Sequence, residues 1–149
     1  MMNRADIYVV DADGSGDNPT QRSGGSSRVY KYVSQSNAIY IQESIFKHKL
    51  HISSTLTKTI RYYIQTDYTN LTSNEIYLEA IYPSSATDSS TSLISSTNSI
   101  STRTNQSDWS QYIEVTISPL NTGWIELSFR LGAYESGKKI WIDPQPEVT

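Results

Sequence analysis

Cysteine is absent from this chain of 149 residues, and other features that would define a protein class are also missing. Without cysteine there can be no disulfide framework and no cysteine-ligated zinc site, which suits folding in a reducing compartment. No apolar run approaches the roughly 20 residues that a membrane-spanning helix needs. No segment with a charged start and an apolar middle opens the chain. We therefore expect a protein without an export signal and without a membrane partner.

Basic residues are also scarce: 12 Lys and Arg stand against 15 Asp and Glu, for a formal net charge of -3. Because the basic residues are dispersed, we expect no surface that follows a phosphate backbone, and nucleic acid is not a predicted partner. The G-x-S-x-G pattern of many hydrolases is missing, and no set of Ser, His and acid has motif support. No carboxylate pair of the kind used in glycoside hydrolysis can be assembled from the sequence. These observations favour a protein that is not an enzyme.

Residues typical of strands are plentiful in this sequence. Tyr occurs 11 times and Trp three times, together with many Ser, Thr and Asn residues. Aromatic and β-branched side chains suit half-buried pleated surfaces. No amphipathic helix of useful length can be recognised. The composition predicts an all-β protein, and the length fits a single domain over residues 1–149.

The clearest pattern lies between Trp109 and Pro144, where apolar and polar residues alternate in three runs. Successive side chains of a strand point to opposite faces, so this alternation predicts strands with one buried and one solvated face. Turn-forming residues at 119–123 and 135–138 separate the runs. The residues expected to face inward are Ile113, Val115, Ile117, Ile125, Leu127, Phe129, Leu131, Ile140 and Ile142.

The rest of the chain contains weaker strand patterns. A long exposed loop is expected at about 11–27, where Gly, Ser and Asp are frequent, and a turn at 71–74. Further strands are expected at 7–10, 29–33, 38–42, 49–53, 60–67, 76–81 and around 92–103. About eight to ten short antiparallel strands predict a β-sandwich of the jelly-roll type, with a barrel as the alternative.

Several motifs near the two ends of the chain resemble known families. The runs Trp109-Ser110-Gln111-Tyr112 and Ile140-Trp141-Ile142-Asp143, on either side of residues 123–131, resemble the closing strands of carbohydrate-binding-module-like jelly rolls. The run DADGSGD at residues 11–17 and the ending YESGKKIWIDP at residues 134–144 resemble uncharacterised jelly-roll proteins of tailed phages. The second resemblance implies a virion component that is made in the host cytoplasm and has capsid or other virion proteins as partners.

Two interpretations of function follow from these resemblances. The first is a non-enzymatic virion structural protein, either a capsid decoration or a head-associated protein. The alternative is a carbohydrate-binding or receptor-binding jelly-roll module. A homo-oligomer is expected, and a glycan is a possible ligand.

One candidate metal site lies in the loop that follows the first strand. Asp11, Asp13, Ser15 and Asp17 place oxygen atoms at alternate positions, with Gly14 at a bend. Calcium takes six to eight oxygen ligands, so this pattern resembles the first half of an EF-hand loop. Arg22 stands where that loop would carry a bidentate Glu. The alternative is a solvated turn built from good turn formers.

A second candidate site consists of aromatic residues on the strand faces opposite the aliphatic ones. Exposed aromatic rings on a sheet can stack on sugar rings or fill a protein interface. The alternative is that loops or the second sheet cover these faces. The residues are Tyr40, Tyr63, Tyr77, Trp124 and Trp141.

The two histidines, His48 and His51, are separated by three positions. On a strand this spacing puts the two rings on opposite faces, so they are not expected to bind one metal ion. Both are expected to be surface residues.

Overall fold

The computed structural model describes residues 6–34, 43–72, 75–81 and 99–149. In these ranges the regular secondary structure consists of strands alone, and all strand pairings are antiparallel. This confirms the all-β prediction. No helix in the described part of the chain is long and apolar enough to span a bilayer. The strands are β1 (Asp6–Asp11), β2 (Arg28–Val33), β3 (Glu43–Ile52), β4 (Lys58–Thr66), β5 (Asn70–Thr72), β6 (Ile76–Ile81), β7 (Ser99–Ser101), β8 (Gln111–Ile117), β9 (Gly123–Leu131), β10 (Lys139–Ile142) and β11 (Glu147–Val148).

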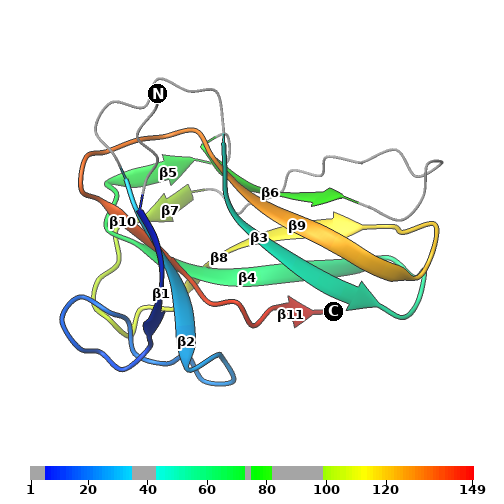
Figure 1. Ribbon diagram of the computed structural model, residues 1–149, viewed down its shortest axis with the longest axis horizontal. Helices are drawn as coiled ribbons and strands as arrows, with labels where there is room; N and C mark the ends of the chain where they lie inside the picture. Colours follow the sequence, from blue (N-terminus) through cyan, green and yellow to red (C-terminus); the bar gives the residue numbers. More distant parts are fainter. Residues whose placement is uncertain (1–5, 35–42, 73–74, 82–98) are drawn as a thin grey trace.

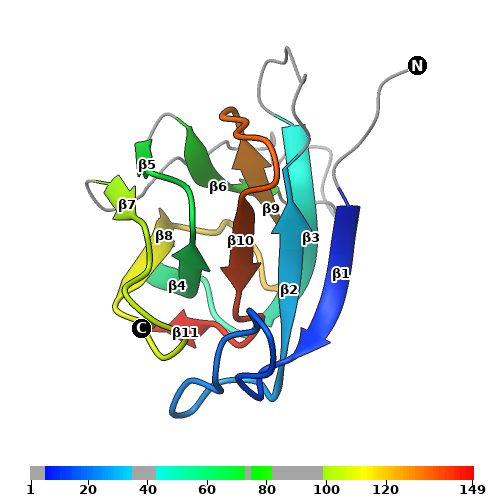
Figure 2. The ribbon, with the colours of Figure 1, turned by 90° about the vertical axis from the view of Figure 1, so that its left-hand side faces the viewer.

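The strands form two facing sheets (Figure 1). The larger sheet has the order β1-β2-β10-β4, with β8 and β11 also paired to β4. The smaller sheet has the order β3-β9-β6, and β5 pairs with β7 in a separate two-stranded sheet. Figure 2 shows β1, β2 and β10 in front of β3 and β9. This is the predicted sandwich, with eleven strands in the described residues.

The core lies between the two sheets. All nine residues expected to face inward from the C-terminal strands are at most 1% exposed, so the predicted register is confirmed. Phe129 on β9 lies at the centre of an aromatic group: its ring is 4.8 Å from that of Tyr62 and 6.4 Å from that of Phe46, edge to face in both cases. Strict alternation works here because one face of each strand meets the opposite sheet.

Some predicted elements differ from the observed ones. The turn expected at 71–74 begins one residue later than predicted, because residues 70–72 form β5 and pair with β7, and the backbone N–H of Glu75 donates to the carbonyl oxygen of Thr72. Leu71 lies opposite Ile100, and both are fully buried, so apolar burial outweighs the turn-forming residues around them. The strand expected at 38–42 lies outside the described residues. Of the strand expected around 92–103, residues 99–101 form β7 and residues 92–98 lie outside the described ranges.

His48 and His51 lie on opposite faces of β3, as their spacing predicts. His51 is exposed and its ring packs edge to face against Trp124, with ring centroids 5.2 Å apart. His48 instead faces the core, where its Nδ1 atom lies 2.6 Å from the hydroxyl oxygen of the buried Tyr62. Burial lowers the pKa of His48. The expectation of two surface histidines is therefore wrong for His48.

The outer face of the larger sheet is partly covered by two connecting segments, residues 12–27 and 102–110. Beneath them lies Trp141, which the alternation places correctly on the outer face but which is fully buried. Trp141 packs with Ala12 and Val29 in a second, smaller apolar cluster, and the guanidinium carbon of Arg103 lies 3.9 Å from its ring centroid. The expectation that Trp141 is exposed is wrong, and the loop at 11–27 is only partly exposed.

Candidate functional site

An open depression of about 510 Å³ lies between the two segments that cover the larger sheet. Its lining combines hydroxyl groups, one amide, one guanidinium, one carboxylate and one indole ring. Such a lining offers hydrogen bonds around an aromatic surface, as small-molecule sites commonly do. The lining residues are Thr20, Gln21, Arg22, Ser23, Ser107, Asp108, Trp109 and Ser110.

The first wall, residues 20–23, is anchored to the end of β10 by a buried ion pair. Asp143 is fully buried, and its Oδ2 atom lies 2.8 Å from Nε of Arg22. The other oxygen, Oδ1, accepts hydrogen bonds from the backbone N–H groups of Ser26 and Gln145. A Cβ atom on Gly25 would lie 2.1 Å from Oδ2, so this turn requires glycine. Wall and strand are thereby held together across a long stretch of sequence.

The second wall, residues 107–110, is organised by the Asp108 carboxylate. Its Oδ1 atom accepts a hydrogen bond from the Ser110 hydroxyl, and its Oδ2 atom accepts bonds from the N–H and hydroxyl of Thr104. These hydrogen bonds lower the pKa of Asp108, and the bond from the Ser110 hydroxyl has the largest effect. The indole N–H of Trp109 donates to the carbonyl oxygen of Thr20 at 2.7 Å, which joins the second wall to the first.

A row of arginine and tyrosine side chains continues from the depression along β4 and β8. The guanidinium carbon of Arg22 lies 4.4 Å from the ring centroid of Tyr63. Tyr63 packs edge to face on Tyr112, with centroids 5.8 Å apart, and Arg61 lies 3.7 Å from the centroid of Tyr112. Arg61 is in turn paired with Glu114 at 2.9 Å. Tyr63, half-buried, is therefore the predicted aromatic residue that adjoins the depression.

The other predicted aromatic residues do not join this surface. Trp124 is 55% exposed but lies on the smaller sheet, Tyr77 on the same sheet is buried, and Trp141 is covered. Tyr40 lies outside the described residues. The four residues in the described ranges therefore do not form one platform, because the strands that carry them belong to two different sheets (Figure 1).

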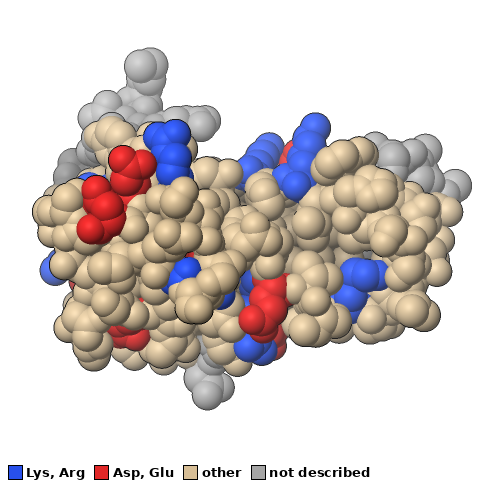
Figure 3. All heavy atoms as spheres, turned by 90° about the horizontal axis from the view of Figure 1, so that it is seen from below, with Lys and Arg blue, Asp and Glu red and all other residues tan. Residues whose placement is uncertain are grey.

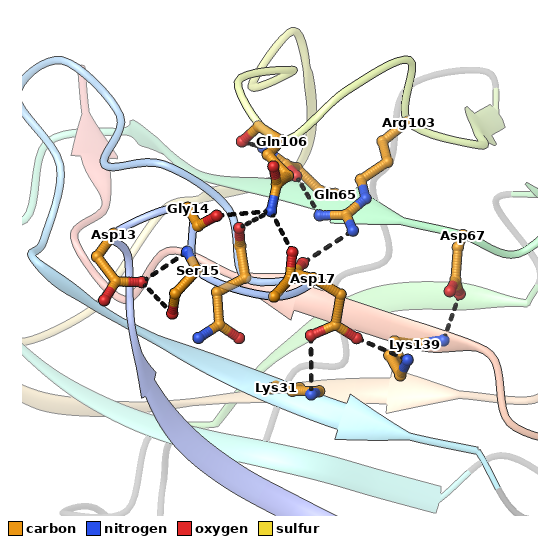
Figure 4. Close-up of polar contacts among 12 residues, drawn as sticks. Asp13, Gly14, Ser15, Asp17, Lys31, Gln65, Asp67, Arg103, Gln106 and Lys139 are labelled. Carbon is orange, nitrogen blue, oxygen red and sulfur yellow. Dashed lines mark hydrogen bonds and ion pairs between the residues drawn. The ribbon is translucent and has the colours of Figure 1, made fainter.

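The acidic loop after β1 has its carboxylates turned to different partners (Figure 4). Asp17 lies 3.3 Å from Nζ of Lys31 and 2.6 Å from Nζ of Lys139. Although desolvation raises the pKa of Asp17, the hydrogen bonds and charges of these lysines lower it overall. Asp13 accepts hydrogen bonds from the N–H and hydroxyl of Ser15, and the exposed Asp11 lies 3.5 Å from Nε of Arg28.

Gln106 fills the middle of the same loop. Its side-chain nitrogen lies 3.0, 2.7 and 2.8 Å from the carbonyl oxygens of Gly14, Gly16 and Asn18 (Figure 4). The carbonyl oxygens that could otherwise bind a cation therefore accept hydrogen bonds from the side-chain amide of Gln106. In the described ranges, no three His, Cys, Asp or Glu side chains lie close enough together to hold a metal ion. Calcium at Asp11, Asp13, Ser15 and Asp17 stays a prediction, one that these contacts do not favour.

Calcium titration tests this loop directly. We expect millimolar calcium to leave the melting temperature unchanged, because the lysines already satisfy Asp17 and Gln106 occupies the carbonyl oxygens. A ligand that binds only the folded state would raise the melting temperature. A rise that Asp13→Ala abolishes, measured by scanning calorimetry with magnesium as the control ion, would instead establish the calcium site.

The sequence did not identify the walls of the depression as a site. Trp109 was predicted only as part of the closing-strand motif Trp109-Ser110-Gln111-Tyr112. The contact between the two walls has no local signal, since Thr20 and Trp109 are 89 positions apart.

Comparison with known proteins supports the fold. No family model matches the chain, and a search of curated proteins finds no match. A solved structure described as "CBM4 structure and function", a carbohydrate-binding module, aligns with a TM-score of 0.50 at 17% identity, over 96% of this chain and 85% of that chain. At this identity the likeness shows the jelly-roll fold alone. None of the comparisons supports the resemblance to phage virion proteins, so the virion role stays a prediction.

Proposed function

We propose that this chain is a non-catalytic carbohydrate-binding module whose ligand lies in the depression around Trp109. The observation that carries the proposal is the combination of an indole ring with hydroxyl and amide groups in one open hollow. A sugar presents an apolar C–H face that can stack on an aromatic ring and hydroxyl groups that need hydrogen-bond partners. The fold shared with a carbohydrate-binding module supports the same interpretation.

The walls of the depression are well ordered by their own contacts. Arg22 is held by Asp143, and its Nη2 atom also donates to the carbonyl oxygen of Gln145 at 3.2 Å. Asp108 is held by hydrogen bonds from Thr104 and Ser110. A binding site whose side chains are already held in place loses less conformational freedom when the ligand arrives. This favours recognition of a ligand that makes few contacts.

The surroundings of the site suit an extended, weakly charged ligand. The row from Arg22 through Tyr63 to Tyr112 offers further hydrogen-bond donors and aromatic edges beyond the depression. On the face shown in Figure 3, most of the surface is neither acidic nor basic, and side chains of both signs occur on it. That face therefore lacks the single-sign surface that a polyanion would require.

Substitution of Trp109 tests the site. Trp109→Ala is expected to weaken saccharide binding roughly tenfold, the equivalent of about 1.4 kcal/mol, because the stacking surface is lost. The matched control is Trp124→Ala, which removes an exposed tryptophan from the other sheet and is expected to leave affinity unchanged. The measurement is a titration of isotope-labelled protein with a panel of oligosaccharides, followed by calorimetry on those that bind.

The same titration distinguishes the outcomes. Chemical-shift changes confined to residues 20–23 and 107–110 would support the proposal. Loss of binding in Trp124→Ala but not in Trp109→Ala would move the site to the smaller sheet. Absence of binding to every saccharide would refute the carbohydrate-binding function. Because Trp109 also packs against the apolar cluster of Ala12, Val29 and Trp141, the melting curve of Trp109→Ala must show that the variant is folded.

A further inference from the structure

Strand β1 forms an edge of the larger sheet and carries three consecutive exposed apolar side chains. Ile7, Tyr8 and Val9 are 50%, 46% and 51% exposed. Among the described residues, β1 pairs only with β2 (Figure 2). An edge strand presents backbone N–H and C=O groups that can pair with a strand from another chain. The same pairing would also cover apolar side chains on both faces of such a strand.

The register explains why two of these residues are exposed. Ile7 lies opposite Tyr32 and Val9 lies opposite Tyr30, so both point to the side of the sheet that faces the core. The core cluster includes Tyr32, with Tyr30 packed against it, but it does not include Ile7 or Val9. Strand β1 therefore extends past the edge of the core, and its inward face is uncovered in the described structure.

We propose that β1 pairs with β1 of a second copy of this chain, antiparallel and about a two-fold axis at Tyr8. In this register Ile7 lies opposite Val9 of the second copy, so apolar residues meet apolar residues. The same register places Asp6 opposite Val10 and leaves Asp11 beyond the paired residues, away from the apolar centre. Paired interfaces of this self-complementary kind are the commonest in symmetric oligomers. The two larger sheets then form one continuous sheet.

The dimer is weak and has a consequence for ligand binding. One pair of six-residue strands covers less surface than the roughly 800 Å² per partner typical of stable complexes. Association is therefore concentration-dependent. If the proposed carbohydrate site exists, a dimer carries two copies of it, and two linked sites bind a repeating polymer more tightly than one. This consequence rests on the proposed function, whereas the dimer itself does not.

A single introduced cysteine tests the two-fold axis. The natural chain has no cysteine, so any cross-link must involve the introduced residue. Tyr8→Cys places two thiols opposite each other across the axis, within reach of a disulfide, and it is expected to form covalent dimers under mild oxidation. The matched control is Leu120→Cys, 72% exposed in the turn between β8 and β9, which is expected to remain monomeric. Equal cross-linking of both variants would contradict the proposed axis.

Sedimentation velocity over a range of concentrations tests the dimer without cross-links. The natural chain is expected to shift from monomer to dimer, and Val9→Lys is expected to weaken association roughly tenfold or more, because charges at a sheet edge oppose pairing. Leu120→Lys, a charge at another exposed apolar position, is expected to leave the dimer intact. A natural chain that stays monomeric at all concentrations would overturn the proposal. The proposal would also be overturned if the edge of β1 pairs with a strand of a different protein and not with a second copy. Saccharide binding by the monomer, measured separately, is unaffected by that result.

Discussion

Phe129→Ala is expected to lower the free energy of unfolding by about 3–5 kcal/mol, a large part of the stability of an ordinary domain. The ring is fully buried on β9 and makes edge-to-face contacts with Tyr62 and Phe46. Its removal leaves a cavity between the two sheets and breaks both aromatic contacts. Urea unfolding, followed by tryptophan fluorescence and by circular dichroism, measures the loss.

A smaller change on the same strand calibrates this result. Ile125→Val, which removes one methylene group from another fully enclosed position, is expected to cost about 0.5–1.5 kcal/mol. A Phe129→Ala variant as stable as Ile125→Val would mean that the space between the sheets collapses around the missing ring. That outcome would contradict the tightly packed aromatic centre described above.

Trp141→Ala is expected to cost about 3–5 kcal/mol as well, although the side chain lies on the outer face of its sheet. The indole is fully buried, packs with Ala12 and Val29, and lies beneath the guanidinium of Arg103. Loss of the ring also removes the apolar support of the two segments that form the depression. The melting temperature should fall, and limited proteolysis should cut residues 12–27 faster than in the natural chain.

Trp124→Ala is the matched control for this experiment. Trp124 is 55% exposed, so its removal is expected to change the free energy of unfolding little. If Trp141→Ala were tolerated as well as Trp124→Ala, the two covering segments would contribute no stability and the depression would not be a preformed site. An interface role for Trp141, the expectation from sequence alone, predicts that tolerant outcome.

Much of the fold could be predicted from residue patterns because the information is local. In β8 and β9, each residue is assigned to a face by the two-residue period of the backbone. Ile113 and Phe129 could therefore be placed in the core without knowledge of any partner strand. The first residue of the turn expected at 71–74 shows the limit of local patterns, since Leu71 is held in a strand by Ile100, far away in the sequence, and the turn begins at Thr72.

The acidic loop shows the same limit in a polar setting. The spacing of Asp13 and Asp17 is right for a cation, but a carboxylate binds whichever positive group the fold brings to it. Here that group is a pair of lysines for Asp17, Lys31 from β2 and Lys139 from β10. Neither lysine has a spacing to Asp17 that would reveal the contact.

The sequence by itself determined the all-β class, the alternating faces of the C-terminal strands and the outward direction of Trp141, because these depend on the backbone period and on composition. Only the tertiary structure decided that Trp141 is buried and that a depression exists beside it. Those properties depend on contacts such as that between Arg22 and Asp143, which are 121 positions apart in the chain. Contacts at that separation are made by the folding of the two sheets, and no local pattern of residues encodes them.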